Sequence, residues 1–266
     1  MPDDVAALTA RLSSAGFIAA EEEANELLAC AGGDPERLDS LVGRRLTGEP
    51  LAWITGRVSF CGLEIRVDPG VYVPRWHSEP LARRAADRLP ATGVAIDLCT
   101  GAGAIARTLI AHRPGARVVA SDVDERAIAC AAANGVEVYR GDLFAPLPRA
   151  LEGRVDVVIG VVPYVPTPAL ALLQRDTFAF ESPLAYDGGR DGTDILRGVL
   201  RDSPRFLRRV VRDSRRFLRR GGALLLELGG EQAGLLGDEL ARLDYVNVGI
   251  LRDAESDVRG IEATRA

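Results

Sequence analysis

The chain has 266 residues, of which 47% are hydrophobic and 27% charged, and its formal net charge is −5. This length suits one large domain or two small ones. The composition is that of a globular protein, and the acidic balance gives no general attraction to nucleic acid or to anionic membranes. All 33 basic residues are arginine, which excludes a lysine Schiff base and a phosphate-loop lysine.

The cysteines and histidines favour neither a zinc site nor a disulfide framework. Four cysteines are scattered without a C-x-x-C pair, beside only two histidines. We therefore expect no bound metal and a reducing, cytoplasmic location. The N-terminus lacks an apolar signal core, and no apolar run approaches the ~20 residues that span a bilayer, so we expect no membrane association.

The first part of the chain predicts a small helical domain followed by a hairpin. Apolar residues recur at near-helical spacing through residues 5–47, whereas β-branched and aromatic residues alternate around Gly62. The turn Asp68-Pro-Gly70 and an extended segment then lead into a helix predicted over 81–89. We expect the linker between two domains in this region.

The stretch from Val94 to His112 predicts the centre of a parallel α/β fold. An apolar strand over 94–98 is followed by the turn Thr100-Gly-Ala-Gly103 and a helix over 104–112. The glycines allow a tight turn and the close approach of a ligand. A third glycine is absent, so the spacing departs from the dinucleotide-binding fingerprint. An ordinary α/β turn without a ligand stays open as the alternative.

Acidic residues follow the next two predicted strands. The strand over 117–122 ends in Asp122, where a carboxylate is placed to accept hydrogen bonds from ribose hydroxyls. After a third strand over 136–139, Asp142 and Leu143 are placed to hold an adenine. A solvated aspartate is the alternative for Asp122.

Further elements continue the α/β alternation. They are a helix over 125–133, strands over 155–160, 221–229 and 246–251, a Gly- and Asp-rich loop over 181–194, and a last strand after the acidic residues 253–257. The strand over 155–160 delivers the following residues to the carboxyl edge of the sheet, which is where ligands bind in open α/β sheets.

One internal repeat is rich in arginine. The nonapeptide Arg201–Arg209 recurs as Arg212–Arg220, and eleven residues are close to three helical turns, which would place Phe206 and Phe217 on one side. Two interpretations are open for this predicted helix over 201–220. It is either a docking surface for RNA or an acidic partner, or a duplication that lengthened one surface helix.

Several motifs carry a resemblance to a known family. They are Gly48-Glu-Pro-Leu-Ala-Trp-Ile-Thr-Gly56, the pair Pro74-Arg75 after the hairpin, Asp97-Leu-Cys-Thr-Gly-Ala-Gly103, Glu181-Ser-Pro-Leu-Ala185 with Gly188-Gly-Arg-Asp-Gly192, and the segment Gly221 to Gln232. Together they resemble the protein-(glutamine-N5) methyltransferases that modify peptide release factors, and more closely a divergent actinobacterial-type branch. The resemblance covers nearly the whole chain.

The resemblance implies a class I methyltransferase domain of the Rossmann-like α/β type over 76–266. A helical substrate-holding domain over 1–56 and a hairpin linker over 57–75 would precede it, and S-adenosylmethionine would be the cofactor. The implied cofactor-binding residues are Asp97, Leu98, Cys99, Thr100, Gly101 and Gly103 in the turn, Asp122 and Val123 after the second strand, Asp142 and Leu143 after the third, and Val161 after the fourth.

The family's N-P-P-Y motif is Val161-Val162-Pro163-Tyr164 in this chain. In the family, the Asn oxygen and the next carbonyl accept hydrogen bonds from the target NH₂ and orient its nitrogen. Val161 removes the first acceptor, whereas Val162 keeps a backbone carbonyl, and Pro163 and Tyr164 remain to shape and stack a planar acceptor. Losing such a hydrogen bond lowers selectivity by up to ~10⁴-fold. We therefore expect an acceptor whose NH₂ needs no holding, such as a hydroxyl, a secondary amine or a ring nitrogen.

Two other departures from the family pattern lie near this site. The family's P-R-P-x-T-E is Pro74-Arg-Trp-His-Ser-Glu79 here, and His77 is a candidate general base because histidine titrates near neutrality. A linker-surface position without function is the alternative for His77. Cys99 replaces a glycine and adds bulk beside the cofactor.

The sequence as a whole predicts an S-adenosylmethionine-dependent methyltransferase that acts on a nitrogen or oxygen, with Val162, Pro163, Tyr164 and His77 as catalytic residues. We expect the acceptor to be a small molecule, such as a secondary-metabolite intermediate, or a protein side chain other than the release-factor glutamine. Two alternatives stay open. One is authentic glutamine methylation of a release factor, and the other is a non-catalytic protein that binds the cofactor and docks through the arginine-rich helix.

Overall fold

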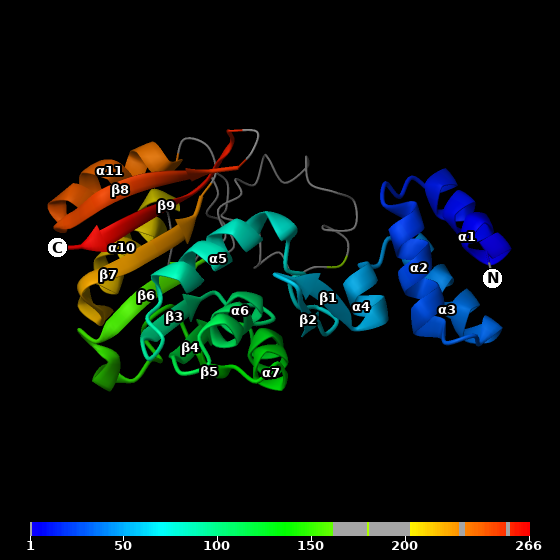
Figure 1. The fold of residues 1–266 in the computed structure, drawn as a ribbon, viewed down its shortest axis with the longest axis horizontal. Helices are drawn as coiled ribbons and strands as arrows, with labels where there is room; N and C mark the ends of the chain where they lie inside the picture. The colour runs from blue at the N-terminus through cyan, green and yellow to red at the C-terminus, as the bar shows by residue number, and fades with distance from the viewer. Residues whose placement is uncertain (1, 162–179, 181–202, 229–231, 254–255) are drawn as a thin grey trace.

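The computed structural model describes residues 2–161, 180, 203–228, 232–253 and 256–266. At one end of the molecule lie the helices α1 (Pro2–Ser14), α2 (Ala20–Ala31) and α3 (Pro35–Leu46), as expected for residues 5–47 (Figure 1). None of the helices in the described part of the chain combines the length and the apolarity that a bilayer crossing requires.

Local signals define the helical end. α2 ends at Gly32, whose φ of 64° is left-handed, and α3 begins after Asp34, whose side chain accepts hydrogen bonds from the backbone N–H groups of Glu36 and Arg37. The apolar faces meet in a small core that includes Leu12 and Leu27, both fully buried. This bundle therefore has an apolar core of its own.

A short helix and a hairpin connect this bundle to the rest of the chain. Helix α4 (Leu51–Thr55) is too short for a periodic pattern and was not predicted, whereas the predicted hairpin is present as β1 (Arg57–Phe60) and β2 (Leu63–Arg66). Trp53 of α4 donates its indole N–H to the carbonyl of Val71, at 2.9 Å. The helix and the segment after the hairpin are thus held together.

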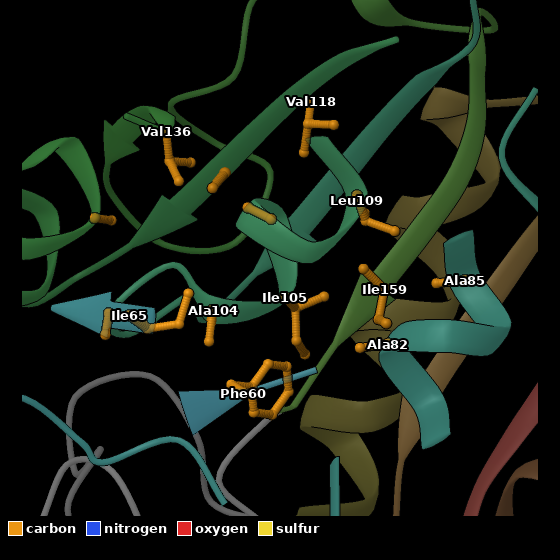
Figure 2. Packing of buried hydrophobic residues seen from close by; sticks show 14 of the residues in the cluster. Phe60, Ile65, Ala82, Ala85, Ala104, Ile105, Leu109, Val118, Val136 and Ile159 are labelled. Atoms are coloured by element: carbon orange, nitrogen blue, oxygen red, sulfur yellow. The ribbon is translucent and has the colours of Figure 1, made fainter. Parts of the chain in front are cut away.

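The hairpin packs into the core of the following domain. Figure 2 shows Phe60 and Ile65 beside Ala104 and Ile105, and all four belong to one buried cluster. Phe60 and Ile65 are each only 1% exposed. The hairpin is therefore firmly attached next to the glycine turn, although the division of the chain at residues 56 and 75 stays a prediction.

Seven strands of the described chain form one mixed sheet (Figure 1). They are β3 (Val94–Leu98), β4 (Arg117–Asp122), β5 (Glu137–Arg140), β6 (Val155–Gly160), β7 (Leu218–Glu227), β8 (Tyr245–Arg252) and β9 (Val258–Arg265). Their order is β5-β4-β3-β6-β7-β9-β8, and β9 runs antiparallel to its neighbours β7 and β8. The chain order reverses at β3, which pairs with β4 on one side and β6 on the other.

Helices cover both faces of the sheet. The helices α5 (Glu79–Arg88), α6 (Ala104–His112) and α7 (Glu125–Ala133) pack on one face, and α10 (Ser203–Phe217) and α11 (Gln232–Arg242) on the other. Neighbouring strand residues point alternately into the two cores, as Ala95 and Ile96 do in β3. Because both faces are buried, the strands are almost continuously apolar, which is the pattern that predicted them.

Most predicted elements are confirmed. The strands over 94–98, 117–122 and 155–160 and the helices over 104–112 and 125–133 have the same bounds in the structure. The strand predicted over 136–139 lies one residue later, and β7 starts three residues before the predicted 221. The predicted loop over 181–194 lies outside the described residues.

The arginine-rich repeat is divided between a helix and a strand. α10 ends at Phe217 and the next three residues begin β7, so the prediction of one helix over 201–220 is wrong for its end. The reason is a tertiary contact, because Leu218 is fully buried and pairs with Val155. This burial and strand pairing outweigh the helical periodicity of the repeat. The side chain of Phe206 lies outside the described residues, so its predicted alignment with Phe217 is untested.

Described arginines of the repeat contact acids of the same chain. The ion pairs are Arg209–Asp142, Arg215–Asp244, Arg216–Glu152 and Arg219–Asp156. An acidic partner would have to compete with these contacts. Docking of such a partner stays a prediction.

Gly103 is required by packing as well as by its backbone, and this generates a first prediction. Its φ is +82°, and a Cβ there would lie 3.0 Å from Val136 Cγ2 and 3.1 Å from Ala131 Cβ. We expect Gly103→Ala to lower the free energy of unfolding by about 3 kcal/mol through left-handed strain and overpacking. Urea unfolding measures this change.

The matched control is Gly43→Ala in α3, where a Cβ would meet nothing within 4 Å. It removes a helical glycine and should stabilise the protein by up to about 1 kcal/mol. Equal stabilities of the two variants would contradict the proposed role of Gly103.

Candidate cofactor and acceptor site

The carboxyl ends of β3 and β6 meet at the point where the strand order reverses. Leu98 of β3 pairs with Gly160 of β6, and on the other side with Ser121 of β4. In open α/β sheets this switch point is where ligands bind. The predicted residues Leu98, Asp122 and Val161 are therefore brought to one edge.

Asp97 joins three elements at this edge. It is 1% exposed, and its Oδ2 accepts hydrogen bonds from Thr100 Oγ1 at 2.6 Å and from the backbone N–H of Ala106 at 3.2 Å. These bonds connect the end of β3, the turn and the start of α6. Burial raises the pKa of Asp97 to about 7, although both hydrogen bonds lower it, and nearby Asp122 raises it further.

The turn after β3 is left-handed at alternate positions. Cys99, Gly101 and Gly103 have φ values of 55°, 55° and 82°. A left-handed cysteine is strained, and a glycine, which the family pattern has at this position, would remove that strain. The nearest atom to a Cβ built on Gly101 is Tyr72 Cβ, at 4.0 Å, so the turn is open on this side.

Asp122 is tied to the turn. Its Oδ2 accepts the backbone N–H of Gly101 at 2.9 Å, and its Oδ1 accepts that of Asp124 at 3.0 Å. Burial raises its pKa, and backbone hydrogen bonds, first that of Asp124, oppose the rise. Each carboxylate oxygen has two lone pairs, so acceptor capacity remains. Val123 next to it is 48% exposed and adds an apolar surface.

Asp142 and Leu143 follow β5 at the same edge. The backbone N–H of Gly141 donates to the Asp122 carbonyl at 2.8 Å, which brings the two strand ends together. Leu143 is 4% exposed and has a φ of 49°. Asp142 bonds to Arg209 of α10, a residue that the sequence analysis did not place at this site.

The other side of the edge holds His77 and a glutamate that the sequence analysis missed. His77 lies in a short 3₁₀ turn, Trp76–Ser78, and its Nε2 is 3.6 Å from Oε1 of Glu227. Glu227 is 2% exposed and ends β7, one residue after Leu226 pairs with Gly160. The available signal was an acid directly after the apolar run Ala223 to Leu226.

Val161 follows Gly160 and packs against the same core as α5 and α6. It therefore lies at the strand end next to Glu227. The remaining predicted catalytic residues Val162, Pro163 and Tyr164 lie outside the described residues.

Comparison with known proteins gives the family. The chain is 36% identical over 214 residues to the release factor glutamine methyltransferase of Geobacter sulfurreducens, covering 78% of this chain and 68% of that protein. The chain belongs to the release factor glutamine methyltransferase family. It is therefore an enzyme, a methyltransferase that uses S-adenosylmethionine, as the resemblance implied. No family model matches the chain.

A second relative of this methyltransferase has another kind of acceptor in its name. It is the 4-amino-L-phenylalanine/4-methylamino-L-phenylalanine methyltransferase of Streptomyces pristinaespiralis, 34% identical over 213 residues, or 76% of this chain and 68% of the relative. Among solved structures, a methyltransferase from Pyrococcus furiosus matches with a TM-score of 0.52 at 18% identity, covering 84% of this chain and 97% of that one. This likeness supports the predicted class I Rossmann-like fold.

The residues at the edge fit S-adenosylmethionine. The turn is open at Gly101, the carboxylates of Asp122 and Asp142 have acceptor capacity for hydroxyl and amine donors, and Val123 offers an apolar contact. Acids at the ends of successive parallel strands suit a nucleoside that lies along the edge.

The buried acid of the turn generates a second prediction, on pH. The folded pKa of Asp97, about 7, lies above its unfolded value of 3.8, so the unfolded chain releases this proton first. The contribution of Asp97 to the free energy of unfolding therefore falls as pH rises from about 4 to about 7, by on the order of 4 kcal/mol. Asp97→Asn imitates the protonated acid, so its stability relative to the parent should rise over this window and then stay level.

Urea unfolding of parent and variant at about pH 4 and about pH 8 measures this change in relative stability. Asp39→Asn, at an exposed position of α3, is the control and should change neither value. An Asp97→Asn variant with the pH dependence of the parent would contradict the assignment.

Proposed function

We propose that this methyltransferase modifies the amine nitrogen of a small aromatic molecule and not the release-factor glutamine. The observation that carries the proposal is the apolar Val161 after β6, where the family motif has its asparagine. An amide nitrogen is a poor nucleophile because its lone pair is delocalised into the carbonyl, so its methylation needs acceptors that hold the NH₂. An amine has its lone pair available and needs no such acceptor.

The aminophenylalanine methyltransferase among the relatives supports this choice. Its name contains both a primary aromatic amine and the corresponding methylamine. A primary amine and a secondary amine differ in how many N–H donors they offer. An apolar side chain at the Val161 position accepts a hydrogen bond from neither, and so tolerates both.

The cofactor-binding role of the edge is part of the proposal. We infer that the turn from Asp97 to Gly103 holds the methionine part of S-adenosylmethionine, Asp122 the ribose, and Asp142 with Leu143 the adenine. Bound S-adenosylmethionine supplies a methyl group on a positively charged sulfur. The work of the chain is then to position the acceptor nitrogen in line with that methyl group and to exclude water.

His77 and Glu227 would take up the proton that the methylated nitrogen loses. The Glu227 carboxylate beside Nε2 favours the imidazole tautomer that carries its hydrogen there, which leaves the Nδ1 lone pair free to accept a proton. With the cofactor bound, the lone pair of the amine would form the new N–C bond, and the electrons of the C–S bond would stay on sulfur. His77 would then accept the proton of the resulting ammonium.

Glutamine methylation of a release factor is the second candidate, favoured by the names of most relatives. Val162 would have to supply the hydrogen-bond acceptor through its backbone alone. The ion pairs of the arginine-rich repeat within the chain give the docking alternative no support.

The acceptor proposal generates a third prediction. With radiolabelled S-adenosylmethionine, the parent should methylate 4-aminophenylalanine and its N-methyl derivative and leave a release factor unlabelled. The double variant Val161→Asn, Val162→Pro restores the family motif and should gain glutamine methylation by ~10²-fold or more, because the amide is again held. Scintillation counting of each purified product measures the transfer.

Val248→Asn is the matched control, since Val248 is an exposed valine of β8 away from this edge. It should leave both activities at the parental level. Labelling of the release factor by the parent would refute the proposal and favour the second candidate.

The proton-accepting role generates a fourth prediction. His77→Gln should lower kcat by ~10²-fold while KM changes little, and the acidic limb of the pH–rate profile should disappear. Glu227→Gln should lower kcat by less, because the imidazole loses the carboxylate that orients it.

The control for the histidine variant is His112→Gln at the end of α6, where the imidazole Nδ1 contacts the Thr108 carbonyl. It should leave the profile unchanged. A His77→Gln enzyme with the parental kcat, or with the acidic limb intact, would exclude this role.

A further inference from the structure

The basic helix α10 reaches the cofactor edge from the opposite face of the sheet. Its buried residues Leu207, Val210 and Val211 share a core with Leu143 and Phe144, which directly follow Asp142. At the end of the helix Phe217 stacks on Phe144, with ring centroids 4.9 Å apart. The helix and the proposed adenine-binding segment are therefore packed as one unit.

Arg209 makes the direct contact between them. Its Nη1 donates to Asp142 Oδ2 at 2.6 Å, which is the short distance of a charge-assisted hydrogen bond. Its Nε lies 3.5 Å from Oδ2 of Asp213, one turn further along the helix. The guanidinium is thus held by acids on two sides, and its side chain is only 26% exposed.

The contact leaves the other oxygen of Asp142 available. Among the residues that the structure describes, none hydrogen-bonds to its Oδ1, and the side chain is 41% exposed. An ionised carboxylate only accepts hydrogen bonds. With Oδ2 occupied by Arg209, the rotamer of Asp142 is fixed and Oδ1 is presented to a donor.

We propose that Arg209 is a positioning residue for adenine recognition, which orients Asp142 so that Oδ1 accepts a hydrogen bond from the exocyclic amine of the cofactor. This inference rests on the adenine-binding role proposed above for Asp142. It assigns a function to the arginine-rich repeat, because Arg209 is the last residue of the first copy. The corresponding residue of the second copy, Arg220, is exposed at the start of β7 and has no ion-pair partner in the described part of the chain.

We expect the fold to tolerate removal of the guanidinium. Arg209 also lines a hollow between α10 and the segment after Asp142, with Leu147, Arg216 and Phe217 among the other lining residues. A shorter polar side chain there leaves space that is already open to solvent. The packing of Phe144 on Phe217 remains in Arg209→Gln.

The experiment compares two ligands that differ only in the amine of the proposed hydrogen bond. S-adenosylhomocysteine carries the exocyclic amine, and its 6-deamino analogue, with a purine base, has hydrogen in its place. Isothermal titration calorimetry of the parent should show the adenosyl ligand binding ~10²-fold more tightly, because the C6–H of the analogue offers the carboxylate no hydrogen-bond donor. Arg209→Gln should bind the adenosyl ligand about tenfold more weakly and lose about tenfold of this preference.

The matched control is Arg220→Gln, which removes the corresponding arginine of the second copy and should keep the parental affinities. Arg209→Lys keeps the charge without the planar fork and should show an intermediate preference, so it tests the same point should Arg209→Gln fail to fold. In the Asp142→Ala background, adding Arg209→Gln should not change the preference for the adenosyl ligand any further.

Three results separate failure of this inference from failure of its premises. The positioning role would be overturned if Arg209→Gln lowered the affinity for both ligands equally, or for neither. A general charge effect would not distinguish the two bases. An Asp142→Ala variant with the full parental preference would show that another residue reads the amine, and both assignments would then fall. Binding of neither ligand by the parent would refute the proposed cofactor edge itself.

Discussion

The buried carboxyl of Asp97 is the contact on which the ligand edge depends. Its Oδ2 accepts hydrogen bonds from the Thr100 hydroxyl and from the backbone N–H of Ala106. These bonds fix the position of the first turn of α6 relative to the end of β3. Burying an acid is unfavourable, and the raised pKa of about 7 reports that penalty. The hydrogen bonds offset part of it and make the glycine turn rigid. A methyltransferase needs such a rigid turn, because its rate depends on how accurately it holds the reacting groups in position.

Backbone strain is concentrated around the same edge. Cys99 and Leu143, both at the ends of parallel strands, have left-handed φ values that side chains rarely adopt. Packing in a single core offsets the cost of this strain, because Leu143 is buried in that core and Cys99 packs against it. Such strain commonly marks sites where a ligand determines the course of the backbone. Here it lies at the edge that we propose binds the cofactor.

The residues after β6 and the segment around His77 also depart from the family pattern. Val161 stands where the family motif has asparagine, and Glu227, at the neighbouring strand end, has its Oε1 3.6 Å from Nε2 of His77. The two features are chemically consistent with the amine acceptor that we propose. A site for an amine has less need of hydrogen-bond acceptors than a site for an amide, and more need of a group that takes up a proton.

Periodicity in the sequence was enough to determine the local elements of the catalytic sheet. The strands over 94–98 and 155–160 and the helix over 104–112 follow from apolar runs, glycines and flanking turn residues, all of which act over a few positions. The tertiary structure alone decided which distant side chains meet. Arg209 contacts Asp142 across 67 residues of sequence. Leu218 is in a strand and not in the helix that the repeat predicted, because it pairs with Val155 in the sheet. Contacts of this kind depend on strand order and on the packing of α10, and local sequence patterns contain neither.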